Sequence, residues 1–178
     1  MNPLEDVVLT LERTIGEEGW DLPPRLYALV PAAELRAASP DLAAEIGLDP
    51  AADQLVLLEQ PDMPAADSLE ESLATIVWPD AVAGCAIALE RVVLPPAVED
   101  DIPDDADEAA RWVAGHPARE DVRMIVGVLR DGTRHSALRF RRHAADDEVL
   151  HGDDLVPAVG DALEATLEPD EPDDPAAG

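Results

Sequence analysis

The segment that most constrains the fold is residues 121–142, where two strand-like runs flank an Asp131-Gly132 dipeptide. The first run is rich in Val and Ile, and the second contains Thr133, Leu138 and Phe140. Asp-Gly between such runs is typical of a two-residue type I′ turn. The segment therefore predicts an antiparallel hairpin in which Val128 lies opposite His135.

In this register, Met124 lies opposite Arg139, and the second strand has two different sides. Leu138 and Phe140 lie on one side, because side chains alternate along a strand. Arg139, His135 and Arg141 lie on the other side. The hairpin thus presents an apolar face and a basic face.

The basic face belongs to a local cluster of positive charge. The chain has 40 acidic and 12 basic residues, all of them arginine, and eight of the twelve lie between Arg111 and Arg142. Arginine forks bind carboxylate and phosphate well, so one hypothesis is a site for an anion or an acidic peptide. The alternative is a polar outer face whose arginines pair with the acidic connector 99–108. The candidate binding residues are His135, Arg139, Arg141, Arg123 and Arg134.

Apolar periodicity and the Pro and Gly breakers predict a single α+β domain over residues 1–167. About five mostly antiparallel strands form its sheet, with the N- and C-terminal helices packed on it, since strict strand-helix alternation is absent. The element order is α-β-β-β-α-β-β-α with extra helices. The predicted helices are 2–18, 31–48 (in two pieces), 68–77, 107–115 and 155–167, and the strands outside the hairpin are 25–30, 53–60 and 82–94. Residues 168–178 are Pro- and Asp-rich, which predicts a disordered acidic tail.

A second collection of functional residue types lies at 143–154 (HAADDEVLHGDD). Histidine and carboxylate side chains bind divalent metals, although their spacing here matches no compact metal motif. A solvated loop is the competing interpretation. The candidate metal ligands are His143, Asp147, His151 and Asp153.

No catalytic constellation is recognisable, so we expect a chain that is not an enzyme and needs no cofactor. Cys85, the only cysteine, lies inside an apolar strand and is predicted to be a buried structural thiol. Glu90 and Arg91 are neighbours on the same strand, so their side chains point to opposite faces. They cannot act on one ligand as an acid/base pair.

The net charge of −28 opposes binding to nucleic acids and to anionic membranes. A single cysteine fits a reducing compartment. The N-terminal segment carries acidic residues where a signal peptide carries basic ones, and no apolar run reaches ~18 residues. These features predict a soluble cytoplasmic protein.

The absence of lysine and the richness in Ala, Arg, Asp and Pro indicate a high-GC genome, with salt adaptation as the alternative.

The stretch WPDAVAGCAIALERVVLPP (78–96), the HPAR turn at 116–119 and VGVLRDG at 126–132 are the most distinctive motifs. With them, the chain resembles an actinobacterial family of conserved proteins of unknown function over nearly its whole length. The element order and acidity are also similar to the secretion-chaperone-like fold, whose members are small acidic dimers that bind polypeptides. The helical segments 31–48 and 68–77 depart from that minimal pattern.

Three functions remain open from the sequence. The first is a non-catalytic protein-binding, adaptor or chaperone-like module, as a possible homodimer. The second is an anion- or divalent-metal-binding protein that uses the arginine-rich hairpin or the 143–154 segment. The third is a structural protein without a ligand.

Overall fold

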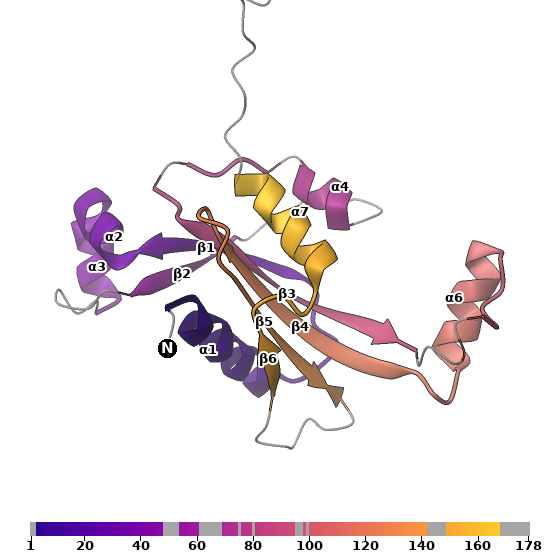
Figure 1. Cartoon of the computed structure of the whole chain (residues 1–178). Helices are drawn as coiled ribbons and strands as arrows, with labels where there is room; N and C mark the ends of the chain where they lie inside the picture. The colour runs from indigo at the N-terminus through magenta and orange to yellow at the C-terminus, as the bar shows by residue number, and fades with distance from the viewer. Residues whose placement is uncertain are drawn as a thin grey trace, which may run out of the picture.

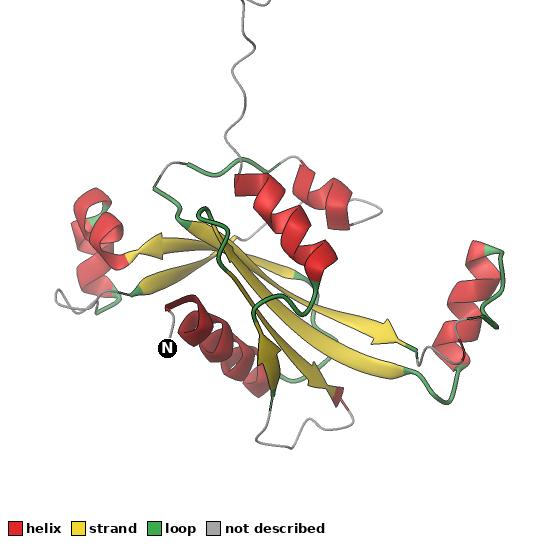
Figure 2. Cartoon of the chain, in the orientation of Figure 1, coloured by secondary structure: helices red, strands yellow, loops and turns green. Residues whose placement is uncertain are grey.

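The structure of the chain is a computed structural model that describes residues 3–47, 54–60, 69–74, 76–79, 81–94, 98, 100–141 and 149–167. It shows one α+β domain with an open antiparallel sheet and helices on both faces (Figures 1 and 2). The strand order is β2-β1-β3-β4-β5-β6. The strands are β1 (Arg25–Pro31), β2 (Leu55–Gln60), β3 (Gly84–Val93), β4 (Glu120–Leu129), β5 (Arg134–Phe140) and β6 (Leu150–Gly152). The helices are α1 (Pro3–Glu18), α2 (Ala32–Ala38), α3 (Pro40–Glu45), α4 (Leu69–Ala74), α6 (Ala106–Gly115) and α7 (Pro157–Leu167).

The N-terminal helix α1 covers one face of the sheet (Figure 1). Its periodic apolar residues predict a buried stripe, and the structure confirms it. The stripe packs on alternate residues of the central strands, so that helix and sheet share one core layer. The helix contributes Leu4, Val7, Val8, Leu11 and Ile15, and the sheet contributes Tyr27, Leu29, Ala86, Ala88, Ile125 and Ala137.

The C-terminal helix α7 and the short α4 cover the opposite face (Figure 1). A second apolar cluster fills this layer and includes Cys85, Ile87, Val126 and Leu163. Because both faces of the sheet are covered, β3 is buried along its whole first part. This explains why its sequence reads as a continuous apolar run rather than an alternating one.

The turn of the central hairpin differs from the predicted one. Leu129 and Thr133 form a backbone hydrogen bond of 2.8 Å, so the loop has three residues, with Gly132 at φ +89°. A type I′ turn needs positive φ at both central residues, and Asp131 lacks it. Instead, Asp131 Oδ1 accepts a hydrogen bond from the Thr133 amide at 2.9 Å.

The predicted hairpin register is therefore wrong by one residue. Gly127, not Val128, lies opposite His135, and Arg123, not Met124, lies opposite Arg139. The added loop residue shifts every pair across the two strands. As a consequence, His135 and Arg139 lie on the face that α1 covers.

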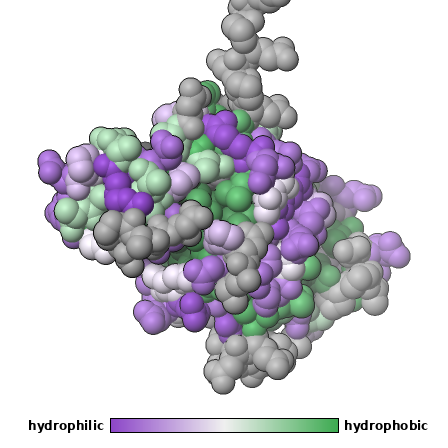
Figure 3. Space-filling model, turned by 60° about the vertical axis from the view of Figure 1, so that its left-hand side comes forward, coloured by the Kyte–Doolittle hydropathy of each residue, from purple (hydrophilic) through white to green (hydrophobic). Residues whose placement is uncertain are grey.

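Two further boundaries differ from the sequence prediction. The sheet has six strands rather than five, because Leu150–Gly152 pairs with β5 as β6. Helix α6 begins at Ala106 rather than at residue 107, and Asp105 caps it, since its carboxylate accepts hydrogen bonds from the amides of Asp107 and Glu108 at 3.0 and 3.1 Å. Within the described residues, no helix is long and apolar enough to cross a membrane. Figure 3 shows hydrophilic residues over much of one face of the molecule, with hydrophobic residues between them.

Arg130, in the hairpin loop, ties three distant segments together. Its guanidinium donates to the carbonyl of Val82 at 2.7 Å and to that of Leu167, at the end of α7, at 2.6 Å. It also reaches the carbonyls of Trp78 and Pro79 at 3.4 and 3.1 Å. A cation at the C-terminal end of α7 is favourable for the helix dipole as well.

Replacement of Arg130 is expected to destabilise the fold. Arg130→Met leaves several carbonyls without their charged donor, so we expect the free energy of unfolding to fall by about 2 kcal/mol. Arg111→Met is the matched control, because within the described residues Arg111 donates to a carbonyl of its own helix, at 3.3 Å, and to no other element. Urea denaturation of both variants checks the prediction. Equal stability of the two variants would contradict it.

Candidate metal site

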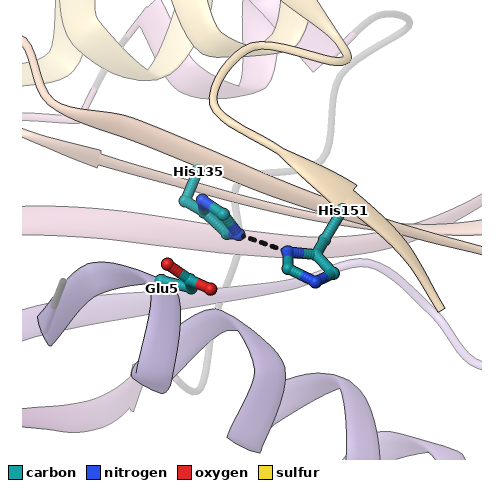
Figure 4. A group of neighbouring side chains, drawn as sticks. All are labelled: Glu5, His135 and His151. Carbon is teal, nitrogen blue, oxygen red and sulfur yellow. Dashed lines mark hydrogen bonds between the residues drawn. The ribbon is translucent and has the colours of Figure 1, made fainter. Parts of the chain in front are cut away.

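Three side chains from different elements converge at the edge of the sheet under α1. They are Glu5 of α1, His135 of β5 and His151 of β6 (Figure 4). His135 Nε2 and His151 Nδ1 are 3.1 Å apart, and one ligand atom of each of the three residues lies within 4.8 Å of the others. His135 is buried, Glu5 is half-buried and His151 is exposed, so the group opens toward solvent.

The close approach of α1 to the sheet brings Glu5 to the histidines. Gly127 lies directly opposite His135 on β4. A Cβ atom at this position would lie 2.8 Å from Leu4 Cδ1 and 3.0 Å from Val8 Cγ2. The glycine therefore leaves room for the first turn of α1, and Leu4, which is fully buried, places its neighbour Glu5 beside the two rings.

The distance between the two ring nitrogens suits a shared metal ion. A tetrahedral zinc ion with metal–nitrogen bonds of about 2.05 Å separates two such nitrogens by about 3.3 Å. The observed 3.1 Å is close to that separation. Shared ligation of one ion would thus change the distance between the two nitrogens by only about 0.2 Å.

Asp153 lies on the other side of His135. Its Oδ1 is 3.7 Å from His135 Nδ1, and its side chain is 96% exposed. When His135 Nε2 binds a metal, the proton of the neutral ring is on Nδ1. A carboxylate there is the common arrangement that orients a histidine ligand.

The structure regroups the residues predicted from the sequence. His151, a predicted metal ligand, meets His135, which belonged to the predicted arginine site, and Asp153 lies beside them. His143 and Asp147 lie outside the described residues. Sequence reasoning missed Glu5, which fits a helix-capping pattern and lies 130 positions before His135 and 146 before His151.

Carboxylates of the same chain meet the guanidinium groups of the predicted arginine site. Arg139 pairs with Glu12, which is 1% exposed on the sheet side of α1. Arg141 pairs with Asp21 at 3.0 Å and with Asp121 at 3.4 Å. These hydrogen bonds raise the pKa of Arg141, with the Asp21 bond as the main cause.

Arg134 meets three acidic residues on the other face, and their hydrogen bonds raise the pKa of its guanidinium. It pairs with Asp154 at 3.3 Å, with Asp161 of α7 at 2.7 Å, and with Glu164. It thus holds α7 to the edge of the sheet. Its partners belong to α7 and the turn before it, not to the acidic connector 99–108 that the sequence suggested.

Arg123 is 1% exposed and lies between α1 and the strands. Its guanidinium donates to the carbonyl of Gly19 and stacks 4.4 Å from the centre of the Trp20 ring. Burial lowers the pKa of Arg123, although Glu90 and Glu12 act in the opposite direction. The anion site around these arginines stays a prediction, and their observed contacts favour a structural role.

Cys85 shows no features of a nucleophile. It is fully buried, and burial raises the pKa of its thiol to about 11. Its Sγ lies 3.6 Å from Thr166 Oγ1, which also accepts a hydrogen bond from the Trp78 indole at 2.9 Å. The predicted buried position of this residue is confirmed.

Comparison with known proteins gives one result. A family model described as PPA1309-like protein matches residues 4–168, nearly the whole chain. No curated protein and no solved structure matched the chain.

The internal pairing of the arginines makes a stability prediction. Glu12→Gln removes the buried carboxylate that pairs with the half-buried Arg139, so we expect the free energy of unfolding to fall by about 3 kcal/mol. Glu17→Gln, an exposed position on the same helix, is the control and should change it by less than about 0.5 kcal/mol. Thermal or urea denaturation measures both. A loss below about 1 kcal/mol for Glu12→Gln would contradict the structural role.

The buried thiol makes a kinetic prediction. With a pKa of about 11, Cys85 holds little thiolate at neutral pH, and the surrounding core blocks reagents. We expect a thiol reagent such as DTNB to label the native protein very slowly, and the protein unfolded in urea at once. Rapid stoichiometric labelling of the native protein would overturn this expectation.

Proposed function

The chain belongs to the PPA1309-like protein family, and we propose that it binds a divalent transition-metal ion. The ion lies between His135 Nε2, His151 Nδ1 and the carboxylate of Glu5. The observation that carries the proposal is the 3.1 Å separation of two ring nitrogens beside a carboxylate. Three protein ligands leave one coordination position for water.

The ligand types favour zinc and similar ions over magnesium and calcium. Imidazole nitrogen suits Zn, Ni, Cu and Fe, whereas Mg²⁺ and Ca²⁺ prefer sites made of oxygen ligands. The chain has 40 carboxylates, which attract any cation weakly. Selectivity for a transition metal therefore has to come from the two histidines.

We further propose that this binding takes place in the reducing cytoplasm of an actinobacterium and involves no reaction. The resemblance of the 78–96 and 126–132 motifs supports the source. The single buried thiol is compatible with the compartment. The inert environment of Cys85 supports a binding role rather than cysteine-based catalysis.

Calorimetric titration of the metal-free full chain tests the site. We expect one Zn²⁺ per chain, with much weaker binding of Mg²⁺. Loss of a direct ligand in His151→Ala or Glu5→Gln should weaken zinc binding by more than the roughly 10- to 100-fold typical of outer-shell changes. Zinc at about 100 times its dissociation constant should also stabilise the wild type against unfolding by about 2.7 kcal/mol.

Two control variants separate this site from its alternatives. Asp6→Asn removes an exposed carboxylate next to Glu5 in α1 and should leave the zinc affinity unchanged. His143→Ala tests the ligand set predicted from the sequence and should also leave it unchanged. Zinc binding that is lost in His143→Ala would favour the ligand set predicted from the sequence and would refute the proposed site.

A further inference from the structure

A second surface, formed by residues other than those of the metal site, lies on α6. This helix stands away from the body of the molecule, beyond the end of the long β3–β4 pair (Figure 1). β1 pairs with β3 only as far as Ala88, so the last residues of β3 extend past the neighbouring strand. No residue of α6 is buried, in contrast to the apolar stripes of α1 and α7.

The sequence of α6 is nevertheless that of an amphipathic helix. Ala109, Trp112 and Val113 recur at helical spacing and are half-buried, while most other positions of the helix are exposed. The Trp112 ring packs on His116, with 4.7 Å between the ring centres. An apolar stripe with a tryptophan at its centre resembles the anchors of protein interfaces.

A helix of this length needs such a stripe to be covered. Isolated helices shorter than about 12–15 residues are marginal in water, and packing of an apolar face supplies most helix stability in proteins. α6 has ten residues, and the Asp105 cap stabilises only its first turn. Coverage of the stripe by a partner would supply the missing packing.

The charges around the stripe specify the kind of partner. Residues 100–108 carry six carboxylates, whereas Arg111 is the only basic residue of the helix. The acidic residues are Asp100, Asp101, Asp104, Asp105, Asp107 and Glu108. A second copy of the chain, with a net charge of −28, would be repelled here. A polypeptide with apolar anchors flanked by Lys and Arg is complementary in both respects.

We propose that the face of α6 formed by Ala109, Trp112 and Val113, with its acidic border, docks a basic amphipathic segment of another protein. The two segments pack apolar stripe against apolar stripe, and the basic flanks meet the carboxylates of residues 100–108. This function goes beyond metal binding and uses different residues, so either proposal can fail without the other.

Binding of designed peptides to the full chain tests this proposal. The probes are a fluorescein-labelled amphipathic Leu/Lys peptide, its Leu/Glu counterpart, and a Lys/Gly peptide without apolar residues. In fluorescence anisotropy, only the Leu/Lys peptide should bind well, and higher salt should weaken it. Trp112→Ser should weaken it about tenfold or more, because a central aromatic anchor carries much of such binding.

Matched variants localise the effect. Val77→Ser removes another exposed apolar side chain, 66% exposed, and should not change the affinity. Asp107→Asn with Glu108→Gln should weaken binding, whereas Asp41→Asn with Glu45→Gln on α3 should not. The proposal would be overturned if the Leu/Lys peptide bound equally well to the wild type and to Trp112→Ser. It would also be overturned if the Lys/Gly peptide bound the wild type as well as the Leu/Lys peptide does.

Two further measurements complete the test. Amide NMR shifts of the wild type on peptide addition should concentrate in α6, and shifts elsewhere with none in α6 would refute the site. In sedimentation without peptide, the wild type and Trp112→Ser should have the same oligomeric state. A dimer that disappears in this variant would instead identify a second copy as the occupant and overturn the basic partner.

Discussion

The packing of α1 on the sheet is the constraint on which the rest of the structure depends. Leu4 and Val8 come so close to β4 that a Cβ atom at Gly127 would force the Leu4 side chain to shift. Farther along the helix, the buried Glu12 meets Arg139 of β5. One helix thus completes an apolar layer, neutralises a strand arginine and carries Glu5 to the histidines, so the candidate metal site follows from the same contact that builds the core.

The distribution of charge links the two proposals. The arginines of the hairpin strands are engaged by carboxylates, backbone carbonyls or the ring of Trp20 within the described part of the chain, as Arg123, Arg134 and Arg141 show. The remaining carboxylates give the exterior a strongly negative field, consistent with the net charge of −28. Such a field attracts cations. A metal ion at the histidine pair and a basic polypeptide at α6 are both positively charged partners.

The sequence predicts most helices, most strands and the packing of the N- and C-terminal helices on the sheet, because these depend on local periodicity and on breakers. The hairpin register was wrong, since Asp-Gly is compatible with both two- and three-residue loops, and the choice depends on the φ of Asp131. β6 has three residues, too few for a periodic pattern. The group of Glu5, His135 and His151 could not be predicted from the sequence, because Glu5 meets the two histidines only when α1 packs on the sheet. No local spacing encodes that contact.

X-ray absorption spectroscopy of the protein loaded with one equivalent of zinc tests the central claim most directly. Shared ligation by two histidines and Glu5 predicts nitrogen and oxygen ligands at about 2.0–2.1 Å, with the outer-shell scattering typical of two imidazole rings. His151→Ala should reduce that imidazole contribution by half. An oxygen-only coordination shell without imidazole scattering would show that zinc binds to the acidic surface, and would contradict the account.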